Sequence, residues 1–347
     1  MKLVECLSIV AAGEDLTQDQ AYGVADLLAS AEVDAGTKAD FLTQLAQKGE
    51  SPQEVAGLAK RYRELARDPG LQEWQDRAID VCGTGGDKQH TFNISTTVTF
   101  VVAAAGIPVF KHGNRSITSK CGSSNLLEAL GVTIMGEDTL LRESMRELGF
   151  CFMFAPAFHP AFKEIVPVRQ VLAEKGQRTV FNMLGPLINP AKPPYQLLGV
   201  FSESVVELMA SAQHALGLKA GLIVHCDLGE LGGMDEFSAA GTNVGRGFGT
   251  LRDVAERWSP EEMGIRSGSL DDLQGGNVDV NLSILDQLLD GKAKPALEDS
   301  VVANAAAAFF VAGRYTSIRE GIAEARDLLL GGLTRAKIDQ TREFYNQ

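Results

Sequence analysis

The stretch Asp-Val-Cys-Gly-Thr-Gly-Gly-Asp at residues 80–87 decides the fold of this chain. It overlaps a short apolar run, Ala78 to Val81, that is typical of a buried strand, and it precedes a helical pattern from Thr96 to Ala105. Its three glycines let the backbone adopt positive φ and approach a ligand closely. Backbone N–H groups there gather near a helix N-terminus, where anions are favoured. The stretch therefore predicts an α/β unit that binds an anion such as phosphate.

A second polar segment follows the next predicted strand. After the apolar run Ile107–Phe110 comes Lys-His-Gly-Asn-Arg-Ser at residues 111–116, and Gly-Ser-Ser at 122–124 opens another helical pattern. Either loop alone is compatible with an ordinary solvated turn before a helix cap. Two such loops after two successive strands favour a ligand site, because ligands of open α/β sheets bind beyond the carboxyl ends of the strands. Together they predict a site for a phosphorylated sugar.

The pattern of elements predicts two domains. Residues 1 to about 73 are helical in pattern, and Ser51-Pro52-Gln53-Glu54 is a capping box with proline at the first helical position. From residue 74 onward, short apolar runs alternate with helical patterns, and the alanine-rich run Val301–Gly313 is typical of a buried helix. The predicted fold class is α/β. A small all-helical domain (1–73) precedes a larger domain (74–347) that has a mainly parallel central sheet flanked by helices.

Composition limits the possible functions. The 347 residues, 45% hydrophobic and 22% charged, describe an ordinary globular chain with room for two domains. The net charge of −13 argues against nucleic acid and acidic membranes as partners, because both require a basic surface. No signal-peptide pattern opens the chain, and no apolar run approaches the roughly 20 residues of a membrane-spanning helix. We therefore expect a cytoplasmic protein.

The acidic pair Asp235-Glu236 is a candidate metal site. Adjacent carboxylates are most often a solvated turn, but this pair follows the predicted strand Gly221–His225 through a glycine-rich loop. It therefore lies beyond a strand end, like the two loops above. Mg²⁺ bound to a pyrophosphate is held by one or two carboxylates together with substrate oxygens. On chemistry alone, Asp227 and Glu230 in the same loop remain open as ligands.

Five ordered blocks of the sequence resemble the anthranilate phosphoribosyltransferase family of tryptophan biosynthesis. The blocks are Asp80–Thr96, Lys111–Val132, Phe154–Arg169, Arg178–Pro190 and Met234–Ser238. The resemblance covers nearly the whole chain. It implies a pentosyltransferase reaction in which the phosphoribosyl group of 5-phosphoribosyl 1-pyrophosphate passes to the amino group of anthranilate. It also implies a homodimer joined through the helical domain, which would take in helices from about 159–184.

The resemblance further implies which residues contact the substrates. The implied contacts to phosphoribosyl pyrophosphate are Gly83, Gly86, Asp87, Thr91, Asn93, Ile94, Ser95, Thr96, Lys111, His112, Gly113, Asn114, Arg115, Ser116, Ile117, Thr118, Ser119 and Ser123. The positions that match the anthranilate contacts are Gly83, Asn114 and Arg169. A guanidinium suits the substrate carboxylate, because it can donate two parallel hydrogen bonds.

The cofactor implied by the resemblance is magnesium, as two ions, with Ser95, Asp235 and Glu236 matching the ligands. No catalytic residue is assigned, because the aromatic amine is already neutral at pH 7 and needs no strong general base. The sequence departs from the family pattern in several places. Cys121 replaces the usual serine, and the loop Cys226–Gly233 is longer than typical. Lys88 stands where glycine is common, and Val171–Gln177 is longer than usual, which leaves the choice of acceptor open.

Two other functions compete with this interpretation. A pyrimidine nucleoside phosphorylase has a similar fold and glycine-rich loop but uses free phosphate, and both Lys111–Arg115 and Asp235-Glu236 speak against it. A non-catalytic paralogue that binds nucleic acid would have a basic surface and eroded motifs. This chain is acidic and retains both motifs, so the transferase is favoured.

Overall fold

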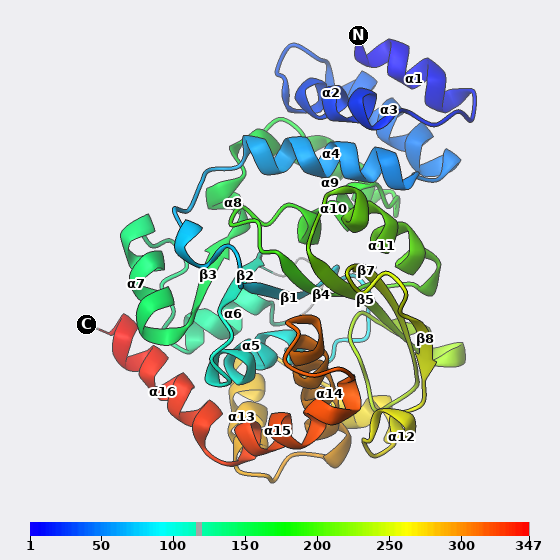
Figure 1. The fold of residues 1–347 in the computed structure, drawn as a ribbon. Coiled ribbons are helices and arrows are strands. Elements are labelled where there is room, and N and C mark those ends of the chain that lie inside the picture. The colour runs from blue at the N-terminus through cyan, green and yellow to red at the C-terminus, as the bar shows by residue number, and fades with distance from the viewer. Residues whose placement is uncertain (116–119, 347) are drawn as a thin grey trace.

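A computed structural model describes residues 1–115 and 120–346, and the chain begins with a helical bundle (Figure 1). The first helices are α1 (Leu3–Ala11), α2 (Gln18–Ala29), α3 (Ala35–Lys48) and α4 (Pro52–Leu65). Thr17, Asp34 and Ser51 cap the last three, since each side chain accepts a hydrogen bond from the backbone N–H three residues further on. The helical start of the chain is as predicted, including the capping box at Ser51.

The central sheet contains eight strands in the described residues. They are β1 (Ile79–Gly83), β2 (Val109–Gly113), β3 (Phe150–Phe154), β4 (Tyr195–Gly199), β5 (Ala220–Asp227), β6 (Gly233–Met234), β7 (Thr242–Gly249) and β8 (Ala255–Trp258). The order is β3-β2-β1-β4-β5-β7-β8, with β6 paired to β5. Neighbours from β3 through β5 pair in parallel, whereas β6, β7 and β8 pair antiparallel. The mainly parallel sheet predicted from the sequence is confirmed.

Helices flank the sheet on both faces (Figure 1). The remaining α-helices are α5 (Ile94–Ala104), α6 (Ser123–Ala129), α7 (Asp138–Leu148), α8 (Ala155–Phe158), α9 (Val166–Glu174), α10 (Phe181–Leu187), α11 (Val206–Ala215), α12 (Pro260–Met263), α13 (Val278–Leu289), α14 (Pro295–Val311), α15 (Ile318–Leu330) and α16 (Leu333–Tyr345). Short 3-10 turns are η1 (Gln72–Trp74), η2 (Pro160–Phe162), η3 (Glu203–Val205), η4 (Gly229–Leu231) and η5 (Leu270–Leu273).

Two large hydrophobic cores lie on the two faces of the sheet. Val81, Leu197 and Leu222 belong to a core shared with α5 and with α13 to α16. Leu198 and Ile223, next to two of these in the strands, point to the other face and share a core with α1 to α4 and α9 to α11. The amino-terminal helices and the sheet are therefore packed through one continuous apolar core.

The helices α9 and α10 lie beside the amino-terminal helices α3 and α4 (Figure 1). The assignment of residues 159–184 to the helical domain and the boundary at residue 73 both stay predictions. On the opposite face, α14 is buried on almost every side, as predicted for the alanine-rich run. No helix within the described ranges has the length and apolar character needed to cross a membrane.

Strand β2 extends beyond the apolar run that predicted it. Lys111, His112 and Gly113 continue the strand in register with β3, instead of forming the start of a loop. Lys111 is 2% exposed, and its Nζ donates a hydrogen bond to the carbonyl oxygen of Val81 at 2.8 Å. A polar residue can continue a buried strand when a neighbouring strand supplies such a partner.

Candidate active site

The glycine-rich loop after β1 is anchored to the end of β4. The backbone N–H of Thr84 donates to Gly199 O at 2.9 Å, and Thr84 Oγ1 accepts from the N–H of Phe201 at 3.1 Å. Arg178 Nη2 donates to Gly86 O at 2.7 Å, and its guanidinium carbon lies 3.9 Å from the centroid of the Phe201 ring. Arg178 is a contact that the sequence interpretation missed. Its place at the head of a family-like block was the available signal.

Positive φ angles give this loop its curvature. Gly85 and Gly86 have φ of +69° and +79°, as expected for glycines that let the backbone turn toward a ligand. Lys88 has φ of +66° and His90 has φ of +54°. Side chains with a Cβ adopt this left-handed region only at an energetic cost. A glycine at position 88 would adopt this conformation without that cost.

The second half of the loop is hydrogen-bonded to two other segments. Gln89 Nε2 donates to Leu231 O at 2.8 Å, which joins the loop to the turn after β5. Phe92 N donates to Leu273 O at 2.9 Å, and Thr91 pairs with Gln274 in an isolated bridge. Thr91, one of the predicted contacts to phosphoribosyl pyrophosphate, is thus half-buried at the edge of the candidate site. These bonds hold the loop without help from a ligand.

The acidic pair joins the loop after β1 to the start of α5. Asp235 Oδ2 accepts from the N–H of Gly85 at 2.6 Å, and Glu236 Oε1 accepts from the N–H of Ser95 at 2.9 Å. Gly83 permits the approach, because a Cβ there would lie 2.3 Å from Asp235 Oδ2. The structure therefore brings together all the predicted metal ligands and the first glycine of the loop.

Neither carboxyl group forms an ion pair among the described residues, and the charge of Lys111 only partly offsets the burial of Glu236. Burial raises the pKa of Asp235 to about 8, and the nearby charge of Asp87 adds to the effect. Burial likewise raises the pKa of Glu236 well above its usual value, with Asp235 as the second cause. Among the described residues, the buried Oε2 of Glu236 has no hydrogen-bond partner. Two such oxygen donors fit a hard divalent cation.

The described residues contain no cluster of three or more His, Cys, Asp or Glu side chains that could hold a metal alone. A cation at Asp235 and Glu236 would therefore need further oxygens from another source. This agrees with magnesium sites in which substrate phosphates complete the coordination of one or two carboxylates.

Helix α5 presents its N-terminus to the same region. Ser95 is half-buried in its first turn, next to the buried residues Ile94 and Thr96. Asn93 precedes the helix, and its side-chain amide donates to Cys121 O at 3.1 Å and accepts from Asn281 Nδ2 at 2.8 Å. Asn93 thus fixes the local backbone, while the first turn of α5 offers the positive end of the helix to an anion.

The predicted contacts to phosphoribosyl pyrophosphate at the end of β2 differ in burial. Burial lowers the pKa of Lys111, whose ammonium is bound to a strand carbonyl beneath the loops. Asn114 and Arg115 are exposed, and Arg115 Nη2 lies 3.0 Å from Glu128 Oε1. Gly113 allows Ser123 to approach, because a Cβ there would lie 2.7 Å from Ser123 Oγ.

Four predicted donor contacts in this region, Ser116, Ile117, Thr118 and Ser119, lie outside the described residues.

A pair of histidines lies on the other face of the sheet from Lys111. The Nε2 atoms of His112 and His159 are 3.2 Å apart, so one ring must donate and the other accept. Burial lowers the pKa of His159 to about 4. Burial, with His159 as the second cause, lowers the pKa of His112 well below its usual value. Both imidazoles are therefore neutral at pH 7.

The histidine pair continues into an aromatic cluster, defined here as Tyr62, His112, His159, Phe162 and Phe181. Ring centroids in it are 5.6 Å apart for His159 and Phe162, 5.5 Å for Phe162 and Phe181, and 4.7 Å for Tyr62 and Phe162. The sequence interpretation identified only His112 of these residues as a site residue. The other four come from three segments: Tyr62 from α4, His159 and Phe162 from η2 and the residue before it, and Phe181 from α10. No local pattern marks these three segments as neighbours.

Arg169 lies at the edge of the aromatic cluster. Its guanidinium carbon is 5.0 Å from the centroid of Phe181, within the range of a cation–π contact. Burial lowers the pKa of Arg169. Of the predicted anthranilate contacts, Arg169 thus lies with this cluster and Gly83 with the acidic pair, whereas Asn114 is exposed at the end of β2.

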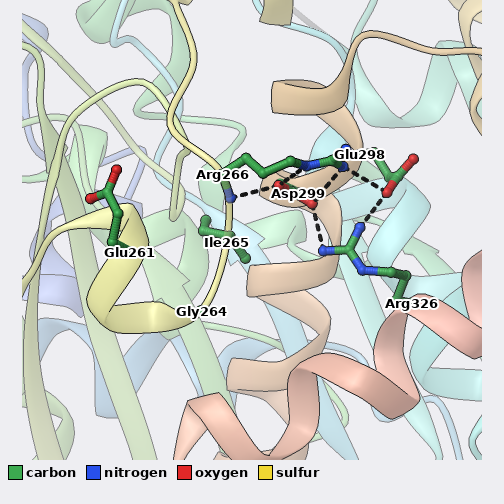
Figure 2. Close-up of a pocket in the computed structure, with 7 residues that line it drawn as sticks. All are labelled: Glu261, Gly264, Ile265, Arg266, Glu298, Asp299 and Arg326. Atoms are coloured by element: carbon green, nitrogen blue, oxygen red, sulfur yellow. Dashed lines mark hydrogen bonds and ion pairs between the residues drawn. The ribbon is translucent and has the colours of Figure 1, made fainter.

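A separate hollow lies away from the strand ends. This open pocket of about 570 Å³ is lined by Glu261, Gly264, Ile265, Arg266, Glu298, Asp299 and Arg326 (Figure 2). Arg266 and Arg326 each contact both Glu298 and Asp299. Because these four charged groups neutralise one another, the pocket offers no unpaired charge from them to a substrate.

The fold and site define a class of protein. Residues 75–335 match the family model described as "Glycosyl transferase family, a/b domain", and residues 4–66 match the one described as "Glycosyl transferase family, helical bundle domain". The first match alone spans more than half of the chain. The class is therefore that of the two-domain glycosyl transferases.

Named relatives narrow the class. An anthranilate phosphoribosyltransferase of Deinococcus radiodurans is 41% identical over 320 residues, 92% of each chain. The crystal structure of the Thermus thermophilus enzyme superposes with a TM-score of 0.88 at 38% identity and covers 100% of both chains. A Saccharomyces cerevisiae enzyme in complex with PRPP and Mg shares the fold, with a TM-score of 0.84 at 22% identity over 99% of this chain and 98% of that one. The chain belongs to the anthranilate phosphoribosyltransferase family, which the sequence motifs resembled.

Proposed function

We propose that this chain transfers the phosphoribosyl group of 5-phosphoribosyl 1-pyrophosphate to the amino group of anthranilate. The products are N-(5-phosphoribosyl)anthranilate and pyrophosphate, and the reaction is a step of tryptophan biosynthesis. The observation that carries the proposal is a pair of hydrogen bonds, from Gly85 N to Asp235 and from Ser95 N to Glu236. They join the glycine-rich loop, the start of α5 and the acidic pair, three segments predicted to bind phosphoribosyl pyrophosphate and its magnesium. Relatives of this name at about 40% identity over nearly the whole chain support it.

On the donor side, the proposed role of the protein is to position the substrate and to balance charge. Displacement of pyrophosphate from the ribose C1 places negative charge on the leaving group and positive charge on the carbon. The backbone N–H groups of the loop around Gly86 and of the first turn of α5 would donate hydrogen bonds to phosphate oxygens. We propose that the donor contacts implied by the family resemblance act in this way.

We further propose that Ser95, Asp235 and Glu236 hold magnesium, as two ions with substrate oxygens. When bound, magnesium supplies positive charge that neutralises the leaving pyrophosphate. The unpartnered Oε2 of Glu236, counted among the residues the structure describes, and the raised pKa values of both acids support this assignment. One solved structure with this fold contains PRPP and Mg.

On the acceptor side, we propose that Arg169 pairs with the carboxylate of anthranilate. The aromatic cluster beside Arg169 suits a flat aromatic ring, because aromatic groups prefer offset or edge-to-face contacts with one another. His112 and His159 are neutral and can form part of the wall of this site. The amine needs no strong base, since its proton becomes acidic only after the new bond forms.

The assembly and location are also proposals. We propose a homodimer joined through the helical domain, residues 1–73 with helices from about 159–184, as the family resemblance implies, and a cytoplasmic location. Light scattering of the purified chain tests the assembly. A mass near 37.1 kDa, that of a single chain, would contradict the dimer.

The experiment that tests the function follows the loss of anthranilate fluorescence when the purified protein is mixed with anthranilate, Mg²⁺ and phosphoribosyl pyrophosphate. Magnesium-dependent loss is the expected result. A reaction without magnesium and a reaction with thymidine and phosphate are the controls. Phosphorolysis of thymidine, without any loss of anthranilate, would favour the nucleoside phosphorylase instead.

A further inference from the structure

Beyond the ion network at Glu298 and Asp299, helix α14 carries the buried polar side chains Ser300 and Asn304. Asn304 is 3% exposed and Ser300 is fully buried. The amide of Asn304 is fully used: Oδ1 accepts from Phe237 N at 3.1 Å, and Nδ2 donates to Phe237 O at 2.7 Å and to Ser300 O at 2.8 Å. A buried amide is costly unless it is hydrogen-bonded. Asn304 therefore holds both polar backbone groups of Phe237.

The two residues after Phe237 are held in the same way. Ser238 N donates to Asn243 Oδ1 at 2.8 Å, and Asn243 Nδ2 donates to Ser238 O at 2.9 Å. Ala239 N donates to Ser300 Oγ at 3.0 Å. Three consecutive residues, which directly follow Asp235-Glu236, are thus each fixed by a buried side chain.

The acidic pair itself is an unfavourable arrangement that needs such support. Two adjacent carboxylates repel each other when ionised, and each here accepts a hydrogen bond from a backbone N–H of a segment far away in the sequence. A backbone free to move would let the two carboxylates separate in the absence of a cation. Ligand groups held in place by surrounding hydrogen bonds bind a metal more tightly, because less ordering is required on binding.

We propose that Asn304 is a positioning residue for the acidic pair, which sets the affinity of this site for a divalent cation by fixing the backbone at Phe237. The inference rests on the proposed function, in which Asp235 and Glu236 hold magnesium. Asn304 lies behind the pair and acts through the chain, without contact to substrate or metal.

Helix α14 is in turn anchored near its N-terminal end by the ion network of Figure 2. Asp299 Oδ2 accepts from both N and Nε of Arg266 at 2.7 Å, so the segment after α12 is tied to α14. Two residues further along that segment, Gly268 N donates to Ala239 O at 2.8 Å. The ion network and Asn304 therefore stabilise the same segment from two directions.

The test compares divalent-cation binding in the full-length protein and its variants. Mn²⁺ serves as the probe, and electron paramagnetic resonance measures free Mn²⁺ in the presence of phosphoribosyl pyrophosphate. Asn304→Ala is expected to raise the Mn²⁺ dissociation constant by about 10-fold or more, as for other residues that support metal ligands. Ser300→Ala is expected to have a smaller effect, because it removes one bond to the segment where Asn304 supplies two. The KM for anthranilate should stay the same in both.

Thr334→Val is the matched control. Thr334 is fully buried, and its hydroxyl donates to Leu328 O at 2.8 Å at the junction of α15 and α16. This variant should lose stability without any change in Mn²⁺ affinity, which separates positioning of the pair from a general loss of stability.

The outcomes distinguish the two proposals. Wild-type Mn²⁺ affinity in a folded Asn304→Ala variant would overturn the positioning role, and if that variant does not fold, unchanged affinity in Ser300→Ala would do so. Wild-type protein that binds Mn²⁺ with phosphoribosyl pyrophosphate but consumes no anthranilate would refute only the proposed reaction. Absence of Mn²⁺ binding by the wild type would overturn both.

Discussion

The donor side and the acceptor side of the candidate site are built from different groups. On the donor side, backbone N–H groups at strand and helix ends meet the carboxylates of Asp235 and Glu236. On the acceptor side, Arg169 lies on the ring of Phe181, which packs through Phe162 against a histidine pair. The geometry of the donor side thus follows from the sheet, whereas that of the acceptor side depends on how helices pack against it.

Burial acts on the two sides with opposite consequences for charge. It raises the pKa values of Asp235 and Glu236, which disfavours the negatively charged forms of both groups on the donor side. It lowers the pKa values of His112 and Arg169 on the acceptor side, where a negative partner would restore the preference for the charged guanidinium. A cation on one side and a carboxylate on the other would therefore both relieve a cost of desolvation.

The largest expected effect comes from neutralising the acidic pair. The double variant Asp235→Asn, Glu236→Gln should lose about 1000-fold in turnover with Mg²⁺, because metal stabilisation of the leaving group contributes several kcal/mol. It should remain folded, since an amide oxygen at each position can still accept the hydrogen bonds from the N–H groups of Gly85 and Ser95. Steady-state kinetics and circular dichroism check both parts. Glu230→Gln, at an exposed position in the turn before β6, is the control for loss of a negative charge and should keep its activity.

The next largest effect tests the rigidity of the donor side. A Cβ at Gly199 would lie 1.4 Å from the backbone oxygen of Asp235, so Gly199→Ala cannot be accommodated by moving a side chain alone. We expect the free energy of unfolding to fall by about 3 kcal/mol, the upper end of overpacking costs. Urea unfolding measures it.

Gly23→Ala is the control for Gly199→Ala. Gly23 lies within α2, where an added Cβ would meet nothing within 4 Å and the backbone has no positive φ. Alanine there should stabilise the protein by about 0.5–1 kcal/mol through its better helix propensity. Equal, small effects at the two glycines would mean that the donor side is not tightly packed against β4.

Local chemistry explains why much of the fold and the donor side could be predicted from sequence. The capping box at Ser51, the apolar strand runs and the glycines of the loop after β1 are signals carried by a few adjacent residues. The continuation of β2 through Lys111 could not be predicted in this way. It depends on a carbonyl of Val81 in another strand, which no pattern within residues 107–116 contains.

The acceptor side was less predictable for the same reason. Arg169 was identified by its motif, but Tyr62 and Phe162 of the nearby aromatic cluster meet only when α4 and η2 pack together. The contact between Arg178 and Gly86 likewise joins residues far apart in sequence. Side-chain clusters assembled by helix packing have no short spacing that marks them.

The third prediction concerns the acceptor side directly. Arg169→Gln should raise the KM for anthranilate by about 10 to 100-fold, the value of a charge-assisted hydrogen bond of about 1.5–3 kcal/mol. The KM for phosphoribosyl pyrophosphate should change little, because Arg169 lies with the aromatic cluster. Lys175→Gln, exposed at the end of the same helix, is the control for loss of a positive charge. An equal rise in both KM values would show that the two sides are not separate.

A smaller effect should appear in the pH dependence of stability without metal. The pKa of Asp235 is about 8 in the folded protein, above its ordinary value near 4 in an unfolded chain. Between these values the folded state retains a proton that the unfolded state has lost. The contribution of Asp235 is therefore fully present below about pH 4 and is lost as the pH rises through about 8.

Thermal unfolding of wild type and Asp235→Asn across this pH range measures that contribution. The wild-type midpoint should fall relative to the variant by a few degrees as the pH rises. Parallel curves for the two proteins would contradict a raised pKa at Asp235, and with it the uncompensated burial of this carboxyl group.

The smallest effect is expected at Tyr62, the member of the aromatic cluster that comes from α4. Its ring is fully buried, and its hydroxyl has no hydrogen-bond partner among the described residues. A buried hydroxyl without a partner costs free energy, so Tyr62→Phe should raise the free energy of unfolding by about 1 kcal/mol. Tyr22→Phe should have the opposite sign, because the Tyr22 hydroxyl donates to Glu64 Oε2 at 2.5 Å and accepts from Arg61 Nη1 at 3.2 Å.

Urea unfolding of the two tyrosine variants, with and without anthranilate, extends the comparison between the two sides. If Tyr62→Phe stabilises the free protein, the Tyr62 hydroxyl is a buried polar group whose desolvation cost no partner in the chain offsets. The acceptor side would then resemble the donor side in this respect. If it destabilises the protein, the hydroxyl has a partner such as ordered water, and the unbalanced polar groups are confined to the donor side. A gain in stability that anthranilate reverses would place the hydroxyl within reach of the acceptor.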